Sequence, residues 1–378
     1  MKNSFASVLR AIAAPLVLFG PGTLPAASPL LDSPRTGGLS LKSISSLSFA
    51  KDGVLLVADP SSQSVIAIDT KDTGPLTLPP KVADVTGTIA PGLGTTAENL
   101  LVRDMAVNPA SGKVYLAVQR RPDNATLILT VNGSGKIEPF MTDTVAWASV
   151  TLPGGTASKV TNITDVAFDG DKIYATGTCN EEFASRIFIV PLPLKHGSTA
   201  NVVSAETFHV AHGKWETKAP IQGFIPYHAA DGAKYIVGAF ACTPVAKFRV
   251  DDISNGAQVK GVSMVELGSG NRPLDLLDYT DKAGKRWLVV HTNRFHPNLF
   301  GPSKFWGVRI NAALLDAPLE KANEKAVRRD VKAKADPQGI EIVDALFGAE
   351  QLDKLDNGRA VVLRGDSGKL SMEVISLP

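Results

Sequence analysis

Three aspartates lie at the start of short apolar runs: Asp104, Asp165 and Asp275. Carboxylate oxygens are the ligands that Ca²⁺ takes at about 2.3 to 2.6 Å, and free carboxylates also act as general bases. The alternative is structural, because an aspartate that opens a strand often accepts hydrogen bonds from backbone N–H groups of a neighbouring sheet. Both interpretations require the elements that carry these residues to converge.

Basic residues and histidines accompany these carboxylates. Arg103 and Arg272 lie close to two of the aspartates, and the segment 291–302 contributes His291, Arg294 and His296. A guanidinium either pairs with a nearby carboxylate or binds an anionic ligand bidentately. We therefore expect Asp104, Asp165, Asp275, His291 and Arg294 as catalytic candidates, and Arg103, Arg272 and His296 as ligand-binding candidates. Trp215 is a further ligand-binding candidate, as an apolar wall or as packing between sheets.

The chain has two cysteines, Cys179 and Cys242. A disulfide between them would close a loop of about 63 residues and contribute roughly 4 kcal/mol in the chain-entropy model. If unpaired, Cys242 together with His212 and His291 offers the thiolate and imidazoles that copper and zinc prefer. Inert buried thiols are the third possibility.

The chain that carries these residues contains a repeated sequence pattern, which we call the repeated phrase. An apolar run leads through a turn such as Lys51-Asp52-Gly53 into a second run rich in Val, Ile, Leu and Tyr, which is typical of a hairpin. The clearest copies cover 44–60, 102–119, 163–178, 221–241 and 271–291, and a looser copy ends at 359–366. A third predicted strand follows each pair.

A period of roughly 50 to 70 residues with three or four antiparallel strands is typical of propeller blades. The sequence predicts an all-β protein, a β-propeller of six or seven blades, with a seventh hidden in 130–160 or 312–336. A pair of β-sandwich domains is the alternative. Ring closure usually pairs the first and last strands, so we expect residues after the export signal to complete the unit that ends at Pro378.

Blade geometry predicts which residues meet. In antiparallel blades, the start of the innermost strand, the end of the second and the start of the third lie at one face of the disc. All the candidates named above map to that face, at the mouth of the central channel, with His212 and Trp215 expected just before a fourth inner strand.

Across about residues 40–378 the chain resembles the broad group of exported propellers that includes the NHL, YVTN and quinoprotein-like families. The resemblance rests on the repeated phrase and on no family-specific motif. It implies a fold and not a chemistry, because propellers host enzymes and binding modules alike. Gluconolactonase-like propellers hold Ca²⁺ in an acidic ring at the channel mouth, so the resemblance allows that role for the three aspartates.

Composition and the N-terminal residues limit the classes of protein to which the chain can belong. The 378 residues are 44% hydrophobic and carry a net charge of +2, which excludes general disorder and disfavours a nucleic-acid partner. Residues 1–28 combine basic residues, a short apolar run and small residues, which predicts a cleaved export signal, with an uncleaved anchor as the alternative. No later segment approaches the roughly 20 apolar residues of a membrane span.

We therefore expect a single propeller domain over 29–378, with a charged insertion at about 312–337, in the periplasm or secreted. The predicted function is a monomeric binding protein that docks a protein or a small molecule at the channel-mouth face. The alternative is a metal-assisted hydrolase or oxidoreductase that uses a divalent cation, Ca, Cu or Zn, on the same face. The sequence contains no covalent haem motif, serine-hydrolase elbow or His-Glu-x-x-His motif.

Overall fold

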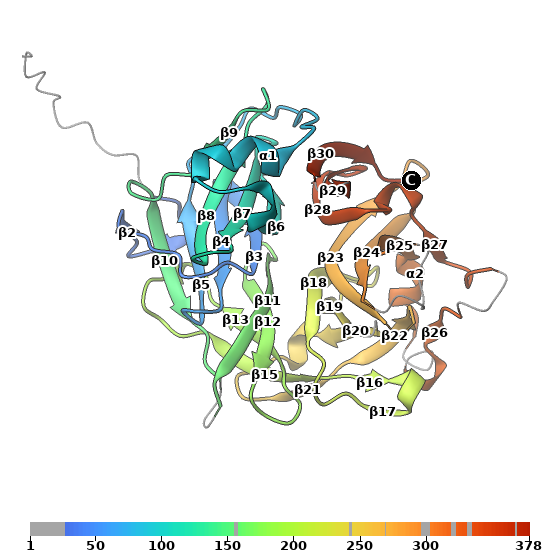
Figure 1. The fold of residues 1–378 in the computed structure, drawn as a ribbon. Helices are drawn as coiled ribbons and strands as arrows, with labels where there is room; N and C mark the ends of the chain where they lie inside the picture. The colour runs from blue at the N-terminus through green and yellow to red at the C-terminus, as the bar shows by residue number, and fades with distance from the viewer. Residues whose placement is uncertain are drawn as a thin grey trace, which may run out of the picture.

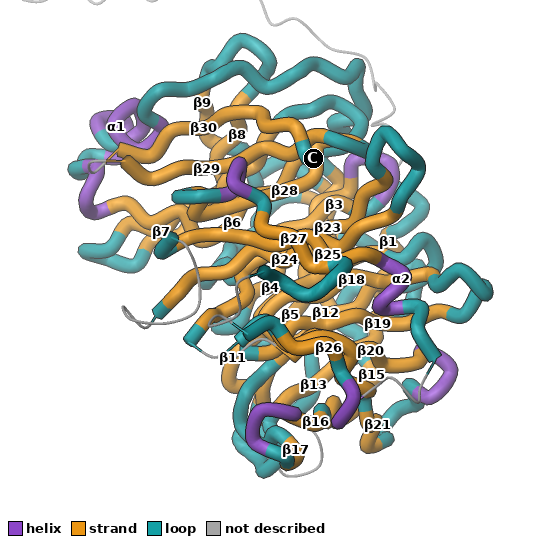
Figure 2. The backbone as a smooth tube through the Cα atoms, turned by 90° about the vertical axis from the view of Figure 1, so that its right-hand side faces the viewer, coloured by secondary structure: helices purple, strands orange, loops and turns teal. Residues whose placement is uncertain are grey.

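The computed structural model describes residues 27–378, except 155–157, 242–243, 269, 296–302, 319–322, 331–334 and 367–368. In this part of the chain, six sheets of three to five strands stand as blades around a central axis (Figure 1). Neighbouring strands pair antiparallel, apart from a few short outer strands. Seen from the side, the chain is almost entirely strand and loop, and its helices are short (Figure 2). The structure thus confirms an all-β propeller and fixes its blades at six.

Each of the first three blades begins with an innermost strand and continues outward through two hairpins to its third strand, and one or more outer strands are added beyond it. Blade 1 contains β3 (Ser46–Phe49), β4 (Val54–Asp59), β5 (Ser64–Asp69), β10 (Ala146–Thr151) and β2 (Arg35–Thr36). Blade 2 contains β6 (Leu100–Val107), β7 (Val114–Arg120), β8 (Ala125–Val131) and β9 (Ile137–Pro139). Blade 3 contains β11 (Val160–Phe168), β12 (Ile173–Cys179), β13 (Ser185–Val190), β15 (Asn201–Glu206) and β21 (Gln258–Lys260).

The last three blades repeat this arrangement. Blade 4 contains β18 (Ile221–His228), β19 (Lys234–Phe240), β20 (Pro244–Arg249), β22 (Val262–Glu266) and β26 (Val327–Arg328). Blade 5 contains β23 (Asn271–Thr280), β24 (Arg286–Arg294), β25 (Phe305–Asn311) and β27 (Ile340–Ile342). Blade 6 contains β28 (Ala349–Asp356), β29 (Arg359–Asp366) and β30 (Lys369–Ser376).

The core is divided among the seams between blades, because both faces of each sheet are covered by neighbours. Strand β4 shows this division: Leu55 and Val57 pack toward blade 2, whereas Leu56 and Ala58 pack toward blade 3. Every residue of β4 and β5 is buried, which explains why these strands are nearly continuous apolar runs. Six such clusters, one for each seam, hold the disc together.

The order of blades in space differs from their order in the chain. Inner strands contact one another in the sequence β6, β3, β11, β18, β23, β28 and back to β6, so blade 1 lies between blades 2 and 3 (Figure 1). The chain leaves blade 1 after β5, builds blade 2, and returns to add β10 to blade 1. The stretches 130–160 and 312–336, which could have hidden a seventh blade, instead supply the outer strands β9, β10 and β26 and the short helix α2 (Ala312–Leu315).

Ring closure also differs from the sequence prediction. The residues after the predicted signal pair with blade 1 through β2 with β10. They also form a separate two-stranded sheet, in which β1 (Leu31–Asp32) pairs with β14 (Leu194–Lys195). The segment between blades 1 and 2 joins blade 6 instead: Val82 forms a β-bridge with Met372, and α1 (Val85–Ile89) packs on β30. The expectation that the N-terminal residues complete the last blade was therefore wrong.

Two segments predicted from the sequence are described only in part. Most of the predicted export signal, residues 1–26, lies outside the described residues. The charged insertion at 312–337 is described in part, and it contributes α2 and the two-residue strand β26 at the edge of blade 4. Among the described residues, no helix has the length and apolar character needed to cross a lipid bilayer.

Candidate functional site

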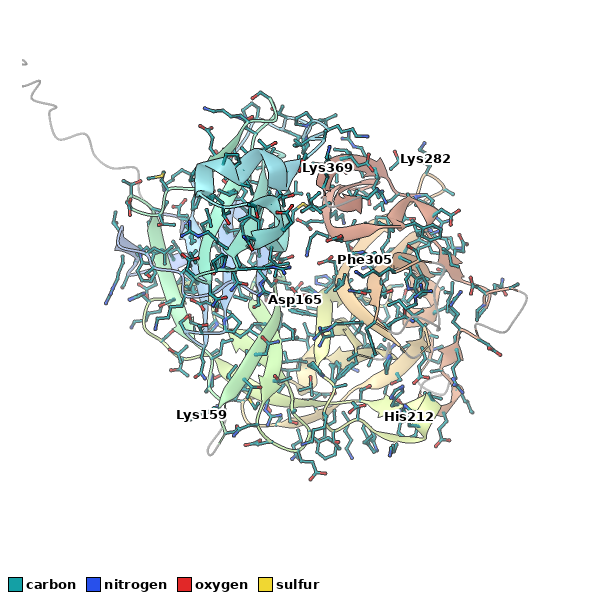
Figure 3. The ribbon with its side chains drawn as sticks, in the orientation of Figure 1. Lys159, Asp165, His212, Lys282, Phe305 and Lys369 are labelled. Carbon is teal, nitrogen blue, oxygen red and sulfur yellow. The ribbon has the colours of Figure 1, made fainter. Side chains whose placement is uncertain are left out.

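A polar cavity of about 270 Å³ opens where the inner strands begin, and we call it the channel mouth. It collects side chains from all six inner strands or the residues that lead into them. Its lining consists of Ser45, Ser46, Arg103, Asp104, Thr164, Asp165, Gln222, Arg272, Pro273, Leu274, Asp275 and Gln351. Five candidates from the sequence lie in this lining: the three aspartates and two of the arginines. Asp165 is labelled near the centre of the disc in Figure 3.

A β-bulge positions these side chains. In β6, β11 and β23 the pairing with the second strand shifts by one residue, just before Asp104, Asp165 and Asp275 respectively. A bulge places two residues opposite one and re-aims the side chains around it. The extra residue in β6 is Arg103, and in β18 it is Gln222, so both polar side chains line the cavity.

The aspartates tie neighbouring inner strands together. The backbone N–H of Leu47 in blade 1 donates to Asp104 Oδ2 at 2.6 Å. The backbone N–H of Phe224 in blade 4 donates to Asp165 Oδ2 at 2.9 Å, while the Ser46 hydroxyl lies 3.0 Å from Asp165 Oδ1. These hydrogen bonds join neighbouring blades, as expected if the aspartates have a structural role.

Asp353 belongs to the same group and was missed in the sequence. Its Oδ2 accepts the backbone N–H of Val107 at 2.6 Å, which ties blade 6 to blade 2. The signal was present in Leu352-Asp353-Lys354-Leu355, an aspartate among apolar residues as in the earlier copies. It was missed because only the second strand of the last repeat, residues 359–366, was recognised in the sequence.

Burial changes the protonation of this group. Desolvation raises the pKa of Asp165 and that of Asp353 to about 7, and the neighbouring carboxylate Asp275 adds to both shifts. Desolvation also raises the pKa of Asp104 well above its ordinary value, with a further contribution from Asp275. Near neutral pH, much of the carboxylate charge in the channel is therefore neutralised by protons.

Asp275 contacts a buried histidine. His291 is 0% exposed, its Nδ1 lies 3.1 Å from Asp275 Oδ2, and its Nε2 lies 2.8 Å from the carbonyl oxygen of Ala349 in blade 6. Because a carbonyl only accepts, Nε2 carries a hydrogen and donates it. Both ring nitrogens of His291 are thus engaged, and the imidazole joins blades 5 and 6.

We expect His291→Ala to lower the free energy of unfolding by roughly 3 kcal/mol, because it leaves a cavity and removes a donor to the Ala349 carbonyl. Urea unfolding measures this cost. The control is His228→Ala, since His228 is 53% exposed and pairs with Asp169 at the surface, and it should cost less than about 1 kcal/mol. A cost for His291→Ala as small as the control's would contradict a structural tie.

The two arginines at the channel mouth have no carboxylate partner among the described residues. Arg103 Nε donates to Gln119 Oε1 at 2.8 Å, and Arg272 Nε donates to Gln222 Oε1 at 2.9 Å. Both side chains are exposed, and neither forms an ion pair although aspartates line the same cavity. The glutamines orient the guanidinium groups and leave their positive charge unneutralised.

Several candidates lie elsewhere. His212 and Trp215 belong to a separate hairpin of β16 (Phe208–His209) and β17 (Lys214–Trp215), and His212 is labelled at the edge of the disc in Figure 3. There Trp215 packs against Phe208, and His212 packs against His209. Their predicted place at the channel mouth was wrong, because residues 208–215 form a hairpin of their own before the fourth inner strand begins at Ile221. Arg294 ends β24 and does not line the cavity.

His212 and His291, the two predicted metal ligands among the described residues, lie apart. His212 lies at the rim, His291 is fully bonded in the core, and Cys242 and the ligand candidate His296 lie outside the described residues. In the described part of the chain, no group of three or more His, Cys, Asp or Glu side chains is arranged to hold a metal ion. Oxygens of the channel carboxylates accept hydrogen bonds from backbone N–H groups, so the geometry of these carboxylates does not favour a cation either.

Cys179, at the end of β12, is a free thiol and only 3% exposed. A free buried thiol is one of the three possibilities that the sequence left open; Cys242, the other cysteine of the possible disulfide, lies outside the described residues. Burial raises the pKa of the Cys179 thiol, and this makes the reactive thiolate scarce.

In a Cys242→Ser variant, we expect no reaction of Cys179 with a thiol reagent at pH 8 while the protein is folded, and one thiol per chain after denaturation. Absorbance from the released reagent counts the thiols. In the unsubstituted chain, denaturation without reductant should release two thiols. A count of zero would show that Cys179 and Cys242 form a disulfide and would contradict the prediction that Cys179 is a free thiol.

Comparison with known proteins assigns the chain to no family. No family model matches the chain, and no curated protein matches its sequence. Among solved structures, it is similar to the PQQ-bound aldose sugar dehydrogenase of Streptomyces coelicolor, with 11% identity, a TM-score of 0.34 and coverage of 90% of this chain and 97% of that one. It is also similar to the endo-arabinase of Bacteroides thetaiotaomicron, with 8% identity, a TM-score of 0.35 and coverage of 81% and 98%. Drosophila semaphorin 1a, extracellular domains 1–2, matches with 11% identity, a TM-score of 0.37 and coverage of 92% and 88%.

Proposed function

We propose that this β-propeller is a binding protein that holds the acid group of a small, hydroxyl-bearing organic anion at the channel mouth, between Arg103 and Arg272. One observation carries the proposal: two exposed guanidinium groups from blades 2 and 5 line one cavity of about 270 Å³ without a carboxylate partner in the described residues. Guanidinium groups bind carboxylates bidentately, and their hydrogen bonds are charge-assisted.

The rest of the lining suits an uncharged, hydroxylated body. Ser46, Thr164, Gln222 and Gln351 offer hydroxyl and amide groups that both donate and accept hydrogen bonds. The cavity volume is small, at the lower end of typical ligand pockets. These features match one sugar acid more closely than an extended protein surface, so we favour a small molecule over a protein partner.

Protonation of the channel aspartates supports an anionic ligand. With a pKa of about 7 for Asp165 and for Asp353, both carboxyls are largely neutral below that pH and repel an anion only weakly. Metal-assisted catalysis is not part of this proposal, because His212 lies at the rim, away from His291, and both nitrogens of His291 are engaged.

Isothermal titration at pH 6 with three sugar acids, galacturonate, glucuronate and mannuronate, tests the proposal. Galactose, glucose and mannose serve as controls because they lack the carboxylate. We expect at least one acid to bind and its neutral counterpart to bind at least tenfold more weakly. Binding of no acid, or equal binding of an acid and its neutral counterpart, would reject the proposal.

We propose further that the protein works outside the cytoplasm, because a basic start, a short apolar run and small residues open the chain. Expression of the full chain followed by fractionation and N-terminal sequencing tests this. We expect a shortened chain in the exported fraction. A full-length chain confined to the cytoplasm would reject the proposal.

A further inference from the structure

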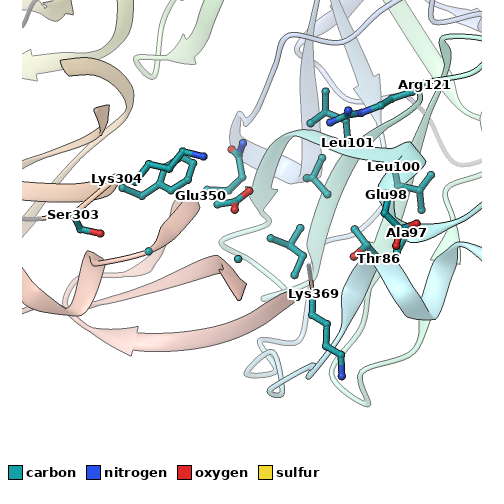
Figure 4. A pocket seen from close by; sticks show the side chains of 16 residues that line it. Thr86, Ala97, Glu98, Leu100, Leu101, Arg121, Ser303, Lys304, Glu350 and Lys369 are labelled. Carbon is teal, nitrogen blue, oxygen red and sulfur yellow. The ribbon is translucent and has the colours of Figure 1, made fainter. Parts of the chain in front are cut away.

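A second cavity adjoins the channel mouth. It has a volume of about 550 Å³ and lies where blade 6 meets blade 2, between the starts of β6, β25 and β28 (Figure 4). Gln351 lines both cavities, and the consecutive residues Val102 and Arg103 line one each. The two cavities therefore adjoin at Gln351, and we call the second one, at the seam between blades 6 and 2, the seam cleft.

The seam cleft carries three cations from three different blades. Arg121 follows β7, Lys304 precedes β25 and Lys369 begins β30. All three side chains are exposed, and among the described residues none of them forms an ion pair; Lys304 Nζ lies 5.1 Å from the centre of the Phe305 ring. Figure 4 shows Lys304 and Arg121 on opposite sides of the cleft, with Lys369 beside it.

The surface between these cations suits sugar rings. Phe305, Leu101 and Leu370 offer apolar area on which the C–H faces of a sugar can pack, and Figure 3 places Phe305 between the central axis and the rim. Glu98 and Glu350 lie in the same lining, where a carboxylate can accept hydrogen bonds from hydroxyl groups. Anionic groups would be held at the cations, and hydroxylated parts between them.

The spacing of the charges distinguishes ligand classes. A di- or triphosphate concentrates its charge and calls for clustered donors, whereas these cations are distributed over blades 2, 5 and 6, with Arg103 and Arg272 further along at the channel mouth. Separate cations along a path match a linear molecule that carries one charge on each of several units. We infer that the ligand is a short acidic oligosaccharide, a chain of uronic acids, that lies from the channel mouth into the seam cleft.

This inference rests on the proposed function, and a comparison of chain lengths separates the two. The probes are matched mono- and trisaccharides of galacturonate, glucuronate and mannuronate, titrated at pH 6. We expect the trisaccharide of at least one acid to bind at least tenfold more tightly than its monosaccharide, because it gains contacts with the seam cleft.

A double variant, Lys304→Ala with Lys369→Ala, should lower the affinity for that trisaccharide at least tenfold and leave the affinity for the monosaccharide within twofold. Lys282→Ala is the matched control, since this exposed lysine follows the opposite end of β23, and it should change neither affinity. Melting temperatures of all variants verify that they are folded.

Each failure has its own meaning. A monosaccharide that binds as tightly as its trisaccharide overturns the seam cleft and leaves the channel-mouth site intact. A double variant that weakens both probes equally also overturns the seam cleft, because the effect is then not specific to the added units. Absence of binding by every probe rejects the cleft and the proposed function together.

Discussion

Arg272→Ala is expected to weaken binding of a sugar acid by roughly 10- to 100-fold, since hydrogen bonds to a charged group contribute about 1.5 to 3 kcal/mol. Arg103→Ala should have a similar effect. Each guanidinium is exposed and is oriented through one glutamine, so its loss removes charge and donors from the cavity without opening the core. Titration calorimetry with the acid that binds best measures both changes.

The matched control is Arg249→Ala. Arg249 is an exposed arginine at the end of β20, where it pairs with Asp251, and it lies outside the cavity lining. Its replacement should change the affinity less than twofold. If Arg249→Ala and Arg272→Ala weakened binding equally, the effect would come from net charge and not from a site at the channel mouth.

The second large effect concerns stability and pH. Asp165 and Asp353 have a pKa of about 7 in the folded protein and near 3.9 in the unfolded chain. Between these values the folded state binds more protons than the unfolded state, so the free energy of unfolding falls as pH rises, by at most about 1.4 kcal/mol per pH unit for each group. Their stabilising contribution is present in full below about pH 4 and is lost by about pH 7.

Urea unfolding at pH 5, 6, 7 and 8 measures this dependence. We expect Asp165→Asn to flatten the decline between pH 5 and 7, because the amide cannot ionise while its oxygen still accepts the Phe224 N–H. Asp165→Ala should instead cost about 1 to 3 kcal/mol at pH 5, since it leaves that N–H unpaired.

The control for this experiment is Asp171→Asn, because Asp171 is 61% exposed and lies outside the channel. It should retain the pH dependence of the unsubstituted protein. If Asp165→Asn kept the same decline as this control, Asp165 would not be the source of the effect.

The repeated strand-turn-strand pattern was sufficient to predict the fold and the five charged residues that line the channel mouth. Because both faces of each sheet are covered, its strands are apolar runs that are interrupted by polar turns. The boundaries of these runs located the starts of β6, β11 and β23. Once those starts were known, antiparallel geometry brought Asp104, Asp165 and Asp275 together. The bulges beside them were invisible, since an extra residue in one strand leaves the apolar pattern almost unchanged.

Features set by irregular segments could not be predicted. The spatial order of the blades depends on the path of residues 70–99, which follow no strand period and carry the β-bridge from Val82 to Met372. The position of His212 and Trp215 was predicted wrongly, because the strands of their hairpin have only two residues each and are too short to show a periodic apolar pattern. The partners of His291 were also hidden, since the Ala349 carbonyl is a backbone group on another blade.

A crystal structure of the protein with a bound sugar acid at pH 6 tests the central claim most directly. We expect the carboxylate of the ligand within hydrogen-bond distance of the guanidinium groups of both Arg103 and Arg272, and its hydroxyl groups in contact with the amides and hydroxyls of the same cavity. A ligand bound at the rim, or in the channel mouth with its carboxylate directed away from both arginines, would contradict it.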